Sequence, residues 1–165
     1  MSDPSMLAVL QDLLAQPRER STIEFKSNWD QADDIGEYLS ALANAAALER
    51  HDRAWMIWGV DDVTRQVTGT SFDPFNQKVK TDKGNSNQSL VMWLQFLTLP
   101  RADFQFHEVL HPEGRVVLLE IHPARSAPVA FKHVRYIRID SHKVKLTEHP
   151  DKEARLWAQL GLKDD

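Results

Sequence analysis

Carboxylates stand at two places in the sequence from which they could converge on one site. Glu19 and Glu24 are five residues apart, and Asp61 and Asp62 directly follow a continuous apolar run. Carboxylate oxygens are suitable ligands for Mg²⁺ or Mn²⁺, and such an ion stabilises charge on a phosphodiester and activates a water molecule. Lys26 would add a positive charge for a phosphate. Spacing alone favours a simpler interpretation, in which Glu24 and Lys26 form a salt bridge and the aspartates form a turn.

A second group of residues that could bind a ligand lies near the C-terminus. Between residues 125 and 145 the sequence has one acid, Asp140, and its basic residues are Arg125, Lys132, Arg135, Arg138, Lys143 and Lys145. On an extended strand, Tyr136 and Arg138 share one face. Such a face could hold phosphates through its cations and stack a base on the ring. A solvated strand face followed by a basic turn is an equally good interpretation.

Composition limits the classes of protein to consider. The chain of 165 residues is 42% hydrophobic and 27% charged, which is typical of one globular domain spanning residues 1–165. A net charge of −4 argues mildly against a generic nucleic-acid-binding protein. The absence of cysteine excludes disulfides and thiolate metal sites, and the N-terminus lacks the pattern of a signal peptide. No apolar run is long enough to span a bilayer, so we expect a cytoplasmic protein with no membrane partner.

Apolar periodicity predicts the elements that must position these residues. Helical spacing predicts helices over residues 6–14, 35–46, 90–97 and 151–160, with Asp33 and Asp34 as an N-cap and Gly161 as a C-cap. Strands are predicted at residues 22–26, 54–60, 104–106, 116–121 and 134–139, with a further strand beginning at 67–69 and a long loop over 72–87. We therefore expect an α+β domain, with a mostly antiparallel mixed sheet packed by two or three helices.

Five short motifs resemble, in order, those of the Schlafen-type AlbA-like domain, AlbA_2: Ile23-Glu-Phe-Lys26, Leu42-Ala-Asn44, Ile57-Trp-Gly-Val-Asp61, Val67-Thr-Gly69 and Tyr136-Ile-Arg-Ile139. The resemblance covers about residues 17–157. It is strongest to bacterial proteins described as transcriptional regulators, in which a winged-helix region follows the domain. The resemblance implies a domain that binds DNA or RNA.

The resemblance also implies a set of site residues. In nuclease members of the family, two glutamates and an aspartate form an acidic triad that cuts structured RNA, such as transfer RNA, with a divalent ion. By position these acids are Glu19, Glu24 and Asp62, with Asp61 as the alternative third member, and Mg²⁺ or Mn²⁺ would be the cofactor. An older family name, divergent AAA, implies ATP binding, which no phosphate-binding loop in the sequence supports. The run of residues 44–49 departs from many members, which have Asn-Thr-x-Gly-Gly there, and this changes the loop beside the aspartates.

Three functions follow from these patterns. We prefer nucleic-acid binding, through Arg125, Lys132, Arg135, Tyr136, Arg138, Lys143 and Lys145. The first alternative is a metal-dependent endoribonuclease that uses Glu19, Glu24, Asp62 and Lys26, and the second is a protein-interaction domain. A homodimer is left open. So is the alternative that the chain is the N-terminal part of a longer protein, because the sequence has no winged-helix region.

Overall fold

The computed structural model describes residues 4–16, 21–28, 31–81 and 84–162. After a first helix, the chain forms a strand–helix–strand unit. Strand β1 (Ile23–Lys26) leads to helix α2 (Ala32–Glu49) and then to β2 (Ala54–Trp58), which pairs in parallel with β1. Two parallel neighbours need a crossover rather than a tight turn, and α2 provides it. The unit brings the Glu24 motif and the residues after Trp58 to adjacent strands.

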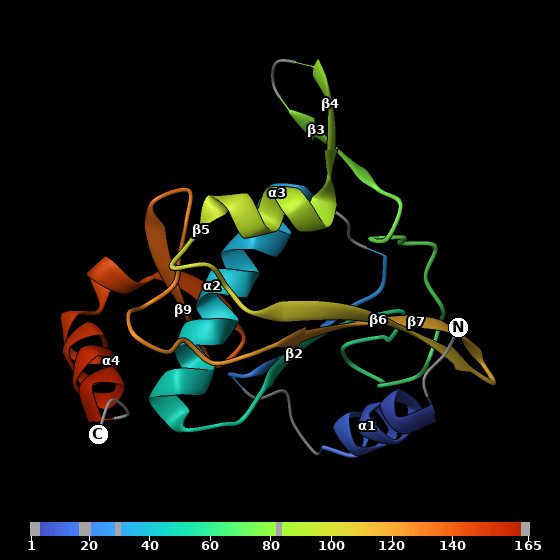
Figure 1. Ribbon diagram of the computed structural model, residues 1–165. Coiled ribbons are helices and arrows are strands. Elements are labelled where there is room, and N and C mark those ends of the chain that lie inside the picture. Colours follow the sequence, from blue (N-terminus) through green and yellow to red (C-terminus); the bar gives the residue numbers. More distant parts are fainter. Residues whose placement is uncertain (1–3, 17–20, 29–30, 82–83, 163–165) are drawn as a thin grey trace.

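The central sheet has four strands in the order β1-β2-β7-β6. Its second half is a hairpin of β6 (Phe104–His111) and β7 (Gly114–Ile121), and β7 pairs antiparallel with β2. Helix α1 (Pro4–Leu14) covers one face, where Leu10 and Leu13 join an apolar cluster with Phe25. Helix α2 covers the other face, as Figure 1 shows.

A second sheet lies on the far side of α2. Its strands lie in the order β10 (His142–Lys145), β9 (Val134–Ile139), β8 (Ala130–Phe131) and β5 (Thr98–Leu99). All their pairings are antiparallel. The hairpin of β3 (Lys78–Thr81) and β4 (Gly84–Ser89) precedes helix α3 (Leu90–Leu97) and projects from the body in Figure 1. A short 3-10 turn (Leu146–Glu148) and helix α4 (Pro150–Leu162) follow the second sheet.

Helix α2 is buried on nearly all sides because it packs between the two sheets. Its small residues allow this close approach: a Cβ on Gly36 would lie 2.2 Å from the Phe131 ring. Two polar side chains, Ser40 and Asn44, are fully buried and bind backbone instead of water. The Asn44 amide donates to the carbonyls of Val129 and Tyr136, at 3.0 and 2.7 Å, and its oxygen accepts from the Val129 N–H at 2.8 Å. Asn44 thus fastens the second sheet to the helix.

The α+β class and the mostly antiparallel mixed sheet are confirmed. The predicted N-cap at Asp33 and Asp34 is wrong, since both lie in the first turn of α2 and Gln31 is the N-cap. Residues 67–69 form only an isolated bridge, between Val67 and Val60, and residues 72–87 contain the β3–β4 hairpin rather than only a loop. Gly161 lies within α4 instead of capping it. None of the helices in the described part of the chain is long and apolar enough to cross a membrane.

Candidate nucleic-acid interface

Glu24 lies in a buried ion pair. Its Oε1 accepts a hydrogen bond from Arg138 Nη2 at 2.6 Å, and Lys26 Nζ lies 3.6 Å from Oε2. Arg138 also donates from Nη1 to the Ile23 carbonyl at 2.6 Å, and only 2% of the residue is exposed. The pair therefore joins β9 to β1 inside the protein. Arg138 does not lie on an open strand face, which corrects the sequence-based interpretation of this residue.

The other predicted acids do not join Glu24 in the described structure. Asp61 Oδ1 accepts hydrogen bonds from the backbone N–H groups of Thr64 and Val63, and these bonds hold the pKa of Asp61 below its ordinary value. Asp62 is exposed in the same turn, and Glu19 lies outside the described residues.

The turn that carries Asp61 and Asp62 reaches the opposite face of the sheet from Glu24. Arg65, in this turn, stacks 4.3 Å from the centroid of the Phe25 ring, and strand alternation sends Phe25 and Glu24 to opposite faces. No group of three metal-ligating side chains is present among the residues that the structure describes. Because Glu24 also has a cation beside each carboxylate oxygen, the described acids Glu24, Asp61 and Asp62 do not by themselves fit a bound Mg²⁺ or Mn²⁺.

Two more of the predicted binding cations are paired with acids at the start of α2. Lys132 Nζ lies 2.5 Å from the Asp33 carboxylate, and Lys143 binds both Asp34 and Glu37. Burial alone would lower the pKa of Lys143, but its hydrogen bonds to the two carboxylates outweigh burial and raise this pKa above its ordinary value. The basic C-terminal stretch thus serves partly to attach the second sheet to α2.

Tyr136 and Arg125 are in different surroundings. Tyr136 is half-buried, and burial together with the charge of Glu37 raises the pKa of its hydroxyl. Tyr136 is therefore only partly open to solvent. Arg125 is exposed on the loop between β7 and β8, where its guanidinium lies 3.6 Å from the Asp103 carboxylate.

Arg135 and Lys145 border an open cavity of about 490 Å³, which we call the basic cavity. It is formed where β5, the β8–β9 hairpin and the end of β10 meet, and its lining residues are Leu99, Ala130, His133, Val134, Arg135, Lys145 and Thr147. None of these described lining residues is acidic. The Arg135 guanidinium also lies 5.4 Å from the centroid of the Trp157 ring on α4, a contact that orients the side chain.

Two other cavities have a different character. One of about 470 Å³ between α2, β9 and α4 is lined by Arg138, Lys152 and Arg155, but also by the acids Glu49 and Asp140. Its cations are therefore partly balanced by carboxylates from the same walls.

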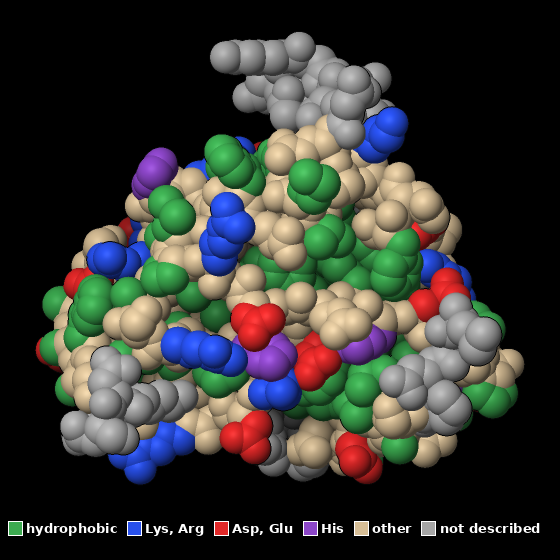
Figure 2. Space-filling model, viewed as in Figure 1, with side chains coloured by type: hydrophobic (Ala, Val, Ile, Leu, Met, Phe, Trp, Pro, Cys, Tyr) green, Lys and Arg blue, Asp and Glu red, His purple; other side chains and the backbone are tan. Residues whose placement is uncertain are grey.

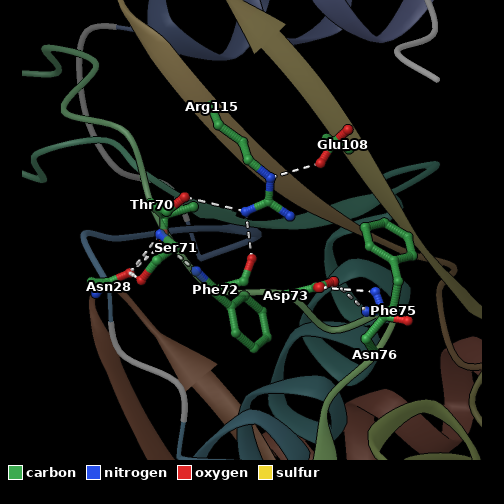
Figure 3. Close-up of polar contacts among 9 residues, drawn as sticks. All are labelled: Asn28, Thr70, Ser71, Phe72, Asp73, Phe75, Asn76, Glu108 and Arg115. Atoms are coloured by element: carbon green, nitrogen blue, oxygen red, sulfur yellow. Dashed lines mark hydrogen bonds and ion pairs between the residues drawn. The ribbon is translucent and has the colours of Figure 1, made fainter.

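The third cavity, of about 260 Å³, is bordered by Asn28, Ser71 and Asp73, whose polar groups bind neighbouring protein groups, as Figure 3 shows. Asn28 Oδ1 accepts from the Thr70 hydroxyl and the Ser71 N–H, and Asp73 accepts from Asn76 Nδ2 at 2.9 Å. This cavity has no cation among its described lining residues.

Arg115, beside that third cavity, fixes the segment that follows Gly69. It donates from Nη1 to the carbonyls of Thr70 and Phe72 and from Nε to Glu108 at 2.6 Å (Figure 3). On the face shown in Figure 2, Lys and Arg side chains likewise lie among acids and histidines rather than in a continuous positive patch. Of these three cavities, the basic cavity is the one whose described lining has cations and no acids.

Sequence reasoning identified Arg135 and Lys145 but missed their neighbours. His133 lies in the two-residue turn between β8 and β9, where it and Lys132 have φ values of 68° and 49°. Leu99 belongs to a strand of two residues, too short to show a period, and Trp157 is an exposed residue of α4. The contact between Arg135 and Trp157 joins a cation to an aromatic ring. Because the two residues lie 22 positions apart, no local pattern in the sequence indicates that contact.

Comparisons with known proteins agree with this fold. The family model described as Schlafen, AlbA_2 matches residues 19–147. No curated protein matches the chain. Among solved structures, the DIP2311 protein from Corynebacterium diphtheriae is similar, with a TM-score of 0.50, 16% identity and coverage of 86% of this chain. The chain spans about a quarter of that protein's length, the matched share being 26%, so the likeness concerns the fold alone.

Proposed function

The chain belongs to the Schlafen AlbA_2 family, and from this premise we propose that it is a nucleic-acid-binding domain that holds phosphates at the basic cavity. The observation that carries the proposal is the lining of that cavity, in which Arg135, Lys145 and His133 occur without a described acid. Phosphates are bound by cations whose charge is not already neutralised by nearby carboxylates.

The pairing of the other cations supports this choice of surface. Lys132, Arg138 and Lys143 each lie within ion-pair distance of a carboxylate from β1 or α2. To bind a phosphate, each would have to leave a partner that attaches the second sheet to β1 or to α2. Arg135 and Lys145 have no carboxylate partner among the described ion pairs, so they can bind without that cost.

A pair of matched double variants tests the proposal. In Arg135→Ala/Lys145→Ala, two cations are removed from the basic cavity, and in Lys152→Ala/Arg155→Ala, two are removed from the cavity that also contains Glu49 and Asp140. Both variants lose the same charge. Fluorescence anisotropy with labelled DNA and RNA should show affinity reduced about tenfold or more in the first and little change in the second. An equal loss of affinity in both variants would mean that binding depends only on the net charge of the protein, and it would reject the proposed site.

The biological setting rests on the resemblance to bacterial transcriptional regulators and stays a prediction. The nuclease alternative also stays a prediction, and the engagement of Glu24 by Arg138 counts against it. Incubation of transfer RNA with Mn²⁺ and either the wild type or Asp62→Asn tests it, because Asp62 is exposed and its replacement should leave the fold intact. Cleavage by the wild type that disappears in Asp62→Asn would favour the nuclease.

A further inference from the structure

Helix α3 presents an uncharged apolar side to solvent. None of its residues, Leu90–Leu97, is charged, and its inward side chains include Leu90, Trp93 and Leu94. One turn apart on the other side, Met92 is 60% exposed and Phe96 is 70% exposed. Figure 2 shows hydrophobic side chains at the surface over this helix. An aromatic ring left so open is available to a partner.

The chain runs directly from this apolar side to the basic cavity. Leu99, three residues after Phe96, is 52% exposed and lines the cavity. The Cα atoms of Phe96 and Leu99 can be at most about 11 Å apart along the chain. The end of α3 is also tied to the β8–β9 turn, because the Leu97 carbonyl accepts from the Lys132 N–H at 3.1 Å. Figure 1 shows β5 leading from α3 toward β9.

The two surfaces together fit a ligand with flat apolar groups and regularly placed anions. We propose, on the basis of the function proposed above, that the ligand is single-stranded nucleic acid, with a base stacked on Phe96 while Arg135 and Lys145 bind the phosphates. In a duplex the faces of the bases are stacked on each other and cannot reach such a ring. A single strand offers both parts at once, and stacking on an aromatic ring tolerates any base.

Anisotropy with labelled single-stranded DNA and RNA oligonucleotides, and with the duplexes of the same sequences, tests the inference. The wild type should bind the single strands more tightly than the duplexes. Phe96→Ala should lose about 5- to 150-fold in single-strand affinity, which corresponds to about 1–3 kcal/mol for one stacked base. Phe96→Trp should retain the affinity. Leu110→Ala, which removes a side chain that is 59% exposed on β6, should behave as the wild type.

The outcomes separate this inference from the function on which it rests. If Phe96→Ala binds as the wild type while Arg135→Ala/Lys145→Ala is weakened, the stacking surface is rejected and the phosphate site stands. If the wild type binds neither single strands nor duplexes, the proposed function fails. If Phe96→Ala alters only the sedimentation coefficient and not the affinity, the α3 surface is a contact between two copies of this chain, and the inference is overturned.

Discussion

The buried ion pair of Glu24 and Arg138 allows a direct test of whether Glu24 stabilises the fold. In Glu24→Met, Arg138 keeps its charge but loses the carboxylate that lies 2.6 Å away. The side chains of Arg138 and Glu24 are 0% and 9% exposed, so water can replace little of the interaction that Arg138 loses. Removing one partner of such a pair costs about 3–5 kcal/mol. Because Arg138 retains its hydrogen bond to the Ile23 carbonyl, we expect the lower value, about 3 kcal/mol.

Urea unfolding followed by tryptophan fluorescence measures this change, since Trp58 is fully buried and reports on the core. The double variant Glu24→Met/Arg138→Met should lose less stability than Glu24→Met alone, because it removes both charges of the buried pair. Glu113→Met, at an exposed glutamate in the β6–β7 turn, is the control. A free energy of unfolding for Glu24→Met within about 0.5 kcal/mol of the wild type would refute the structural role.

Two further predictions concern polar groups that organise the sheets. Asn44→Ala should lower the free energy of unfolding, measured in urea titrations, by about 3 kcal/mol. The reason is that the variant leaves buried backbone groups, including the N–H of Val129, without their hydrogen-bond partners. A change below about 1 kcal/mol would contradict this prediction. Burial alone would raise the pKa of Glu120, but hydrogen bonds from Arg53 and His107 outweigh burial and lower it below its ordinary value. A depressed carboxyl pKa stabilises the fold above the unfolded pKa, and this contribution disappears as the pH falls through the folded pKa. Glu120→Gln should therefore be less stable than the wild type at pH 7 and nearly equal to it at acidic pH, as thermal unfolding across pH would show; a difference independent of pH would contradict this.

Much of the fold could be predicted from local patterns, whereas the partners of the polar residues could not. Alternation correctly places Tyr136 and Arg138 on one strand face, but it cannot tell whether that face meets solvent or protein. Arg138 is buried in a pair with Glu24, and this partner lies 114 residues away in the sequence. A local pattern cannot indicate such a distant partner. The acids Asp33 and Asp34 resemble an N-cap, but they instead pair with lysines of the C-terminal stretch.

Strands whose apolar residues do not alternate, or that are very short, also could not be predicted from local sequence patterns. The β4 sequence, Gly84–Ser89, is polar throughout and predicts a loop, yet it pairs with β3 in a hairpin. Strands β5 and β8 have two residues each, and the basic cavity exists only because they bring Leu99 beside the β8–β9 turn. Arg135 and Lys145 were predicted as binding residues from composition, and their role stays a prediction.

The salt dependence of binding tests the central claim most directly. For single strands, log Kobs falls with log salt concentration by a slope of about 0.7 for each phosphate contact. If Arg135 and Lys145 each hold one phosphate, Arg135→Ala/Lys145→Ala should bind with a slope about 1.4 smaller in magnitude than the wild type. The matched variant Lys152→Ala/Arg155→Ala should keep the wild-type slope. A slope unchanged in Arg135→Ala/Lys145→Ala would contradict the claim that the basic cavity binds the phosphates.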